Sequence, residues 1–167
     1  MSNICCSPLA ETAMRHLIAE EGRLDHFLLA SAGVLAAHVG QSPDPRAMLA
    51  AKRCRLDVGA RRARQVGVMD FKQFDLILAM DRNCAEALRE MALPGTEHKV
   101  HLLLDFSPWI GELEIPDPYA GPAEGFAETL DLIQLAVRGL LEALDQTDAA
   151  FVVPELPRAR LKVSSAT

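Results

Sequence analysis

The chain has 167 residues, of which half are apolar and 24% are charged, and its formal net charge is −6. This length suits one domain with a hydrophobic core. The acidic balance argues against partners that need a basic face, namely nucleic acid and membrane surfaces, and no apolar run is long enough to cross a bilayer. Four scattered cysteines without CxxC spacing, and the lack of a secretion signal, favour a reducing cytoplasmic setting without a structural metal.

The first half of the chain alternates between predicted helices and strands. A helix is expected from the capping pair Ser7-Pro8 to about residue 22, followed by a buried strand at 26–33. A second helix lies within 42–56 and starts around residues 44–46. The continuous apolar run at 74–80 has no polar alternation, which predicts a strand covered on both faces as in a parallel sheet.

The second half continues the pattern. A helix is expected from Asp81, a strand at 99–106, and a long helix whose apolar residues recur in steps of three and four until about residue 144. A loop rich in proline and glycine, 107–121, separates the last two elements. The alternation predicts one parallel α/β domain over 1–144. Residues 145–167 carry prolines, a basic stretch and a Ser/Thr-rich end, and are predicted to form a disordered tail.

Two short segments carry candidate binding and catalytic groups. The pattern “NIC-SP” at a helix start places free backbone N–H groups and the helix dipole where they can hold an anion. The segment “EIPDPYAG” holds Asp117 between two prolines that fix the backbone. A carboxylic acid held over a phosphate site can protonate a leaving oxygen. Taken singly, the first segment is weak evidence because any capped helix start looks similar, and an isolated Asp-Pro is better explained as the cap of a turn.

Several ordered blocks together resemble the low molecular weight protein tyrosine phosphatase family. They run from Ser2 to about Leu144 and include “NIC-SPLAE”, “SAG---AHVGQSPDPRA”, “RARQV”, “DFKQFDLILAMD”, “KVHLLLDF” and “IPDPYAG”. The resemblance implies a three-layer α/β/α fold with a four-stranded parallel sheet and no cofactor. It also implies hydrolysis of a phosphotyrosine protein or a small phosphomonoester through a phosphocysteine intermediate.

The resemblance assigns roles to individual residues. The family loop holds a nucleophilic cysteine, five residues, an arginine, and a serine or threonine. The matching Asn and Ser order this loop, and the matching Asp protonates the leaving phenolate and then activates water, which places the general acid at Asp117. The implied loop remnant is Ser2, Asn3, Ile4, Cys5, Cys6 and Ser7, and the implied substrate pocket is Ala37, Tyr119 and Ala120.

The site departs from the family pattern where the scaffold blocks agree with it. The nucleophile falls one position before Met1, the arginine falls on Cys6, and no cysteine of the chain has an arginine six residues later. Ala37 replaces the pocket aromatic and Ala120 the second tyrosine. Removing a cationic clamp from phosphoryl transfer lowers the rate by about 10³–10⁵. We therefore expect phosphatase activity to be lost or strongly impaired.

Two other functions stay open from the sequence. One is a non-catalytic member of the family that binds phosphate or a protein through the loop. The other, less favoured, is an arsenate reductase, which needs late redox cysteines that Cys54 and Cys84 do not obviously supply.

The family's first strand, which lies in the middle of the sheet, has no counterpart in the sequence. Its absence leaves buried backbone groups of the neighbouring strands unpaired, which is energetically costly. We favour a start assigned at an internal methionine, which leaves three family strands in this chain. The alternative is that the β-prone run “AAFVV” at 149–153 fills the gap.

Overall fold

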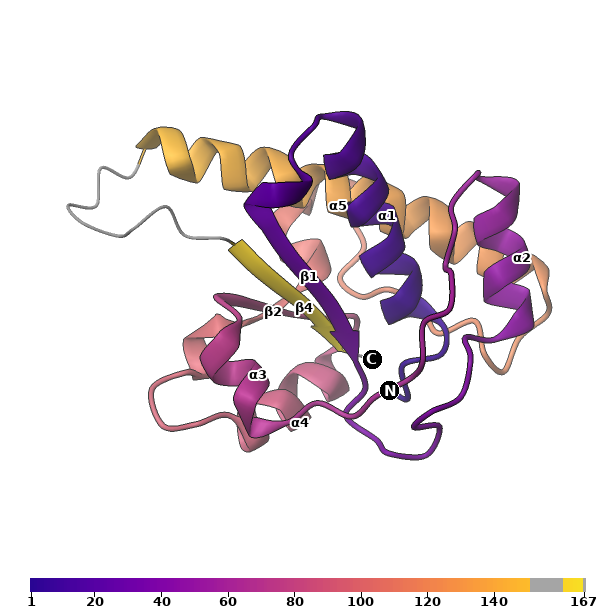
Figure 1. Cartoon of the computed structure of the whole chain (residues 1–167), viewed down its shortest axis with the longest axis horizontal. Helices are drawn as coiled ribbons and strands as arrows, with labels where there is room; N and C mark the ends of the chain where they lie inside the picture. Colours follow the sequence, from indigo (N-terminus) through magenta and orange to yellow (C-terminus); the bar gives the residue numbers. More distant parts are fainter. Residues whose placement is uncertain (151–160, 167) are drawn as a thin grey trace.

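The computed structural model describes the backbone of residues 1–150 and 161–166 and the side chains of residues 1–146. Within these ranges a four-stranded parallel sheet lies between two helical layers, which confirms the predicted α/β fold (Figure 1). The strands are β1 Phe27–Ala32, β2 Leu76–Ala79, β3 Val100–Leu102 and β4 Leu161–Ala166. The α-helices are α1 Cys6–Glu20, α2 Pro45–Arg53, α3 Val68–Gln73, α4 Arg82–Met91 and α5 Glu124–Ala150. Short 3-10 turns are η1 Leu24–His26, η2 Glu97–Lys99, η3 Leu103–Phe106 and η4 Pro108–Ile110.

Strand β2 shows how the two layers are separated. Leu76 and Leu78 belong to the apolar cluster that includes side chains of α1, α2 and α5, whereas Ile77 and Ala79 belong to the cluster with α3 and α4. Successive side chains of a strand point to opposite faces, so a strand covered on both sides is apolar throughout. The prediction made from the run at 74–80 is therefore confirmed. No helix in the described part of the chain combines the length and apolarity needed to span a bilayer.

One strand is shorter than predicted, and one short helix was not predicted. The strand expected at 99–106 ends at Leu102, because the Asp105 carboxylate accepts a hydrogen bond from the Leu102 N–H at 2.9 Å and the chain turns into η3. Helix α3 was not predicted, since six residues are too few to show a helical period. Its start is fixed by Asp70, whose carboxylate accepts from the Gly67 N–H at 2.8 Å.

The middle of the sheet is formed by β4, and the prediction of a disordered tail is wrong for this segment. The strand order is β1-β4-β2-β3, and every neighbouring pair is parallel. Ala166 pairs with Ala32 on one side and with Ala79 on the other. Pairing on both sides satisfies the backbone N–H and C=O groups that an open gap leaves exposed between β1 and β2. The sheet consequently has four strands in place of the three expected.

The segment that fills the gap is not the one considered from the sequence. Ala149 and Ala150 are the last residues of α5, which runs past the predicted end near residue 144. Residues 151–153, the rest of “AAFVV”, lie outside the described residues. Figure 1 shows β4 between β1 and β2, with its arrow pointing toward the end of the sheet near the N-terminus.

Removing residues 161–167 is expected to destabilise the whole domain, because it strips hydrogen-bond partners from two buried strands. Each buried backbone group left unpaired costs about 1–3 kcal/mol, so we expect the free energy of unfolding to fall by more than about 3 kcal/mol. Urea unfolding measures this change. A chain ending at Ala166 is the control and is expected to match the full chain. Equal stability of all three chains would contradict the position of β4.

Candidate active site

The loop at residues 2–5 lies between the carboxyl end of the sheet and the start of α1, and Asn3 fixes its shape. Asn3 is 3% exposed and has a left-handed backbone with φ 59°, a conformation that asparagine tolerates better than most residues. Its side-chain Nδ2 donates to Ser7 Oγ at 2.9 Å, and its Oδ1 accepts from the Arg64 backbone N–H at 3.0 Å. Asn3 thus ties the loop to α1 and to the segment before α3.

Gly33 lets the loop approach the sheet. A Cβ atom at this position, just after β1, would lie 2.6 Å from Met1 O and 2.9 Å from Asn3 N. The neighbouring Leu35 N–H donates to Met1 O at 3.1 Å, so the close approach is held by a hydrogen bond. Only glycine fits here without moving the loop.

Helix α1 begins two residues earlier than expected. Cys5 is its N-cap residue, Cys6 is its first residue, and no side chain caps the first turn. The prediction that Ser7 caps the helix is therefore wrong, because Ser7 lies inside α1, fully buried, and its hydroxyl accepts from Asn3. The first turn carries no acidic side chain. Its backbone N–H groups therefore keep the anion-binding character of a helix N-terminus.

A pocket of about 60 Å³ opens at this loop. Six of the predicted site residues line it: Ser2, Asn3, Ile4, Cys5, Asp117 and Tyr119. Cys6 and Ser7 are not part of its lining and are fully buried. Ala37 and Ala120 are exposed and are not part of its lining. The structure thus brings most of the predicted residues together, while the two alanines lie outside the pocket wall.

Asp117 and Tyr119 stand at the mouth of the pocket. Asp117 is exposed, and its Oδ1 accepts from the Tyr119 N–H at 3.0 Å, which holds the carboxylate against its own turn. The Tyr119 ring lies 6.4 Å from the ring of His38, a pocket residue that sequence reasoning missed. The sequence block “AHVG”, which contains His38, could have indicated that this residue lies at the pocket. Its Nδ1 is 2.9 Å from Gln41 Oε1.

Arg46 holds the Asp117 segment in place and was also missed. Its Nη2 donates to Tyr119 O at 3.0 Å and its Nη1 to Gly121 O at 3.2 Å. The same guanidinium pairs with the Asp44 carboxylate, which lowers the pKa of Asp44. It also lies 4.5 Å from the centre of the Phe126 ring, at the start of α5. These contacts join residues that are far apart in sequence, so no local sequence pattern predicts them.

Three of the four cysteines are buried and neutral. Burial raises the pKa of Cys5 to about 12 and that of Cys84 to about 12. Burial also raises the pKa of Cys6, and the negative charge of Asp117 adds to the effect. The Cys6 thiol faces Pro116 O at 3.9 Å. Because the thiolate is the nucleophile, none of these three cysteines is activated at neutral pH.

Thiol labelling at pH 8 is expected to modify only Cys54, which is exposed, on the time scale of minutes. Cys5, Cys6 and Cys84 should react after unfolding in denaturant, when burial no longer holds them protonated. Mass spectrometry of labelled peptides measures each site. A Cys54→Ser variant should show no fast reaction, and fast labelling of Cys5 or Cys6 in the folded protein would contradict the burial seen here.

The chain belongs to the low molecular weight phosphotyrosine protein phosphatase family, whose sequence profile matches residues 1–150. It is 39% identical over 145 residues to a putative low molecular weight protein-tyrosine-phosphatase of Synechocystis sp., covering 86% of this chain and 92% of that protein. This match is what the ordered sequence blocks predicted.

Solved structures agree with the sequence comparison. A protein tyrosine phosphatase of Entamoeba histolytica, crystallised with Hepes in its active site, is similar with a TM-score of 0.84 and 32% identity, over 89% of this chain and 94% of that one. Vibrio vulnificus Wzb in complex with benzylphosphonate is similar with a TM-score of 0.74 and 32% identity, over 86% of this chain and 93% of that one. The fold is therefore that of the family.

Proposed function

We propose that this protein binds a phosphomonoester group, with phosphotyrosine as the ligand class, and hydrolyses it weakly or not at all. The proposal rests on the burial and the neutral charge of the Cys6 side chain. Cys6 stands where the family resemblance places the loop arginine, and its thiol is fully buried and held neutral against a backbone carbonyl. A neutral thiol cannot neutralise the charge of a transferring phosphoryl group.

Retention of the loop supports the binding half of the proposal. Asn3 holds the loop through its two side-chain hydrogen bonds, and the first turn of α1 offers backbone N–H groups without a competing acidic side chain. Backbone N–H groups at a helix start bind phosphate without any side-chain cation. The Vibrio relative solved with benzylphosphonate makes a phosphate ester of an aromatic alcohol the ligand to test first.

The charges around the pocket support the loss of catalysis. Asp44 and Asp117 both act on Cys5 in the direction that raises its pKa, and Arg46, which opposes them, is bound to Asp44. The surroundings therefore favour thiols over thiolates. Asp117 lines the pocket, and we propose that it acts as a general acid only where a nucleophile and a cation are present.

The purified protein is expected to hydrolyse p-nitrophenyl phosphate no faster than the buffer alone, since a missing cationic clamp lowers the rate by about 10³–10⁵. Release of p-nitrophenol over hours measures this. The matched variants are Asp117→Ala and, as a control on an exposed acid elsewhere, Asp75→Ala. Turnover by the unmodified chain that disappears in Asp117→Ala and persists in Asp75→Ala would overturn the proposal.

Phosphate binding is tested by titration with inorganic phosphate, followed by amide NMR at residues 4–7. Saturable shifts at these amides are expected, and their absence at millimolar phosphate would count against a retained site. Cys6→Arg restores a guanidinium to the loop and is expected to tighten binding about tenfold or more, as a charge-assisted hydrogen bond should. Cys54→Arg adds the same charge at an exposed position and should leave the affinity nearly unchanged.

A further inference from the structure

A second cavity lies beside the phosphate loop, and we propose that it binds a phosphate-sized oxyanion. Its volume is about 190 Å³, larger than that of the loop pocket. It is formed between α1, β1 and the segment that precedes α3. Its polar lining consists of Asn3, Glu11, Ser31, Arg61, Arg62 and Arg64. This site is distinct from the one in the proposed function and does not depend on it.

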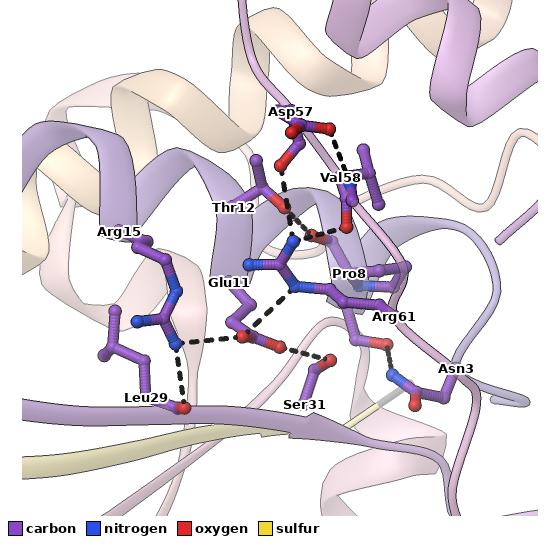
Figure 2. Close-up of polar contacts among 12 residues, drawn as sticks. Asn3, Pro8, Glu11, Thr12, Arg15, Leu29, Ser31, Asp57, Val58 and Arg61 are labelled. Atoms are coloured by element: carbon purple, nitrogen blue, oxygen red, sulfur yellow. Dashed lines mark hydrogen bonds and ion pairs between the residues drawn. The ribbon is translucent and has the colours of Figure 1, made fainter. Parts of the chain in front are cut away.

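Glu11 organises one wall of the cavity (Figure 2). Its side chain is 11% exposed, and its Oε1 lies 3.2 Å from Arg15 Nη2 and 3.2 Å from Arg61 Nε. Its Oε2 accepts from Ser31 Oγ at 2.9 Å. One carboxylate is thus surrounded by two guanidinium groups and a hydroxyl. The two guanidinium groups carry more positive charge than the Glu11 carboxylate carries negative charge, so Glu11 does not prevent an anion from binding in the cavity.

Arg61 carries an incompletely satisfied donor at this wall. Its Nη1 donates to the carbonyl oxygens of Asp57, at 3.3 Å, and of Val58. Its Nε is buried and close to Glu11, yet the N–H is not aligned for a hydrogen bond, and it finds no other acceptor among the described residues. A buried donor of this kind is costly, and an acceptor oxygen inside the cavity removes that cost.

Arg62 supplies charge that no described carboxylate balances. Its Nη1 donates only to main-chain carbonyls, Ala60 O at 3.3 Å and Arg61 O at 2.9 Å. Arg64, by contrast, is paired with both oxygens of Asp70 at 2.9 Å. The lining therefore combines three arginines with one carboxylate, and the planar donor fork of arginine matches the oxygens of a phosphate.

The size of the cavity agrees with this ligand. A water molecule occupies about 30 Å³ in the liquid, so the cavity has room for a tetrahedral oxyanion with its bridging waters. The anion can come from free phosphate or from a phosphorylated side chain of a peptide. Asn3 lines both cavities, so an anion here would sit directly behind the residue that shapes the phosphate loop.

The test is a titration of the full chain with inorganic phosphate, read by amide NMR at Ser31 and Ala63 for this cavity and at residues 4–7 for the loop. Saturable shifts at Ser31 and Ala63 are expected. In Arg62→Ala, which changes an exposed side chain, the affinity at these two amides should fall about tenfold, as loss of a charge-assisted hydrogen bond predicts. Arg53→Ala, on the exposed last turn of α2, is the matched control and should bind as the unmodified chain does.

The two sets of amides separate this inference from the proposed function. Shifts confined to residues 4–7, shifts at Ser31 and Ala63 that never saturate, or equal affinity in Arg62→Ala and Arg53→Ala would each overturn it. Free phosphotyrosine is the second ligand. Saturation at Ser31 and Ala63 by phosphotyrosine as well as phosphate supports a phosphorylated side chain as the source, and saturation by phosphate alone supports the free anion.

Discussion

The shape of the loop at residues 2–5 depends on the two hydrogen bonds of the Asn3 side chain. One reaches Ser7 inside α1 and the other reaches the backbone before α3, so a single amide joins three segments. A buried hydrogen bond contributes about 0.5–1.5 kcal/mol net, whereas a buried partner left unsatisfied costs more. Loss of Asn3 would leave Ser7 and the Arg64 N–H without these partners. The left-handed backbone at Asn3 is held by the same contacts, and Gly33 gives it space.

The environment of this loop keeps its thiols neutral. In a working loop of the family, a cation and a thiolate stabilise each other. Here burial keeps Cys5 and Cys6 neutral by raising the pKa of both thiols, and the charge of Asp117 adds to the effect on both. Asp44 acts on Cys5 in the same direction, and the nearby Arg46 is paired with Asp44. In the proposed function, binding of phosphate would rest on backbone N–H groups and the helix dipole, and such a charge–dipole interaction contributes about 0.3–1 kcal/mol at an exposed site.

The sequence predicted those parts of the fold that are encoded locally. The apolar run at 74–80 marked a strand buried on both faces, and Asp81 marked the start of α4, where its carboxylate does accept from the Cys84 N–H at 2.7 Å. The sequence prediction was wrong or incomplete for residues whose role depends on tertiary contacts. Ser7 was predicted to cap α1, but its hydroxyl accepts a hydrogen bond from Asn3. Arg46 was not predicted as a site residue, because it binds a segment more than seventy residues away.

The largest error of the sequence prediction concerns strand β4, and its cause is physical. Its sequence, “LKVSSA”, is short and mixed in polarity, and β-propensity reflects the neighbours of a strand more than the strand itself. Those six residues are extended because they pair with β1 on one side and β2 on the other.

The position of β4 also links the end of the chain to the loop at residues 2–5. Ala166 pairs with Ala32, the last residue of β1, and the loop packs against Gly33, which directly follows that strand. Pairing between distant parts of a chain raises contact order and slows folding, because loop-closure entropy is paid before such contacts stabilise the chain. The pairing of β4 and the packing of the loop on Gly33 thus meet at the same end of the sheet.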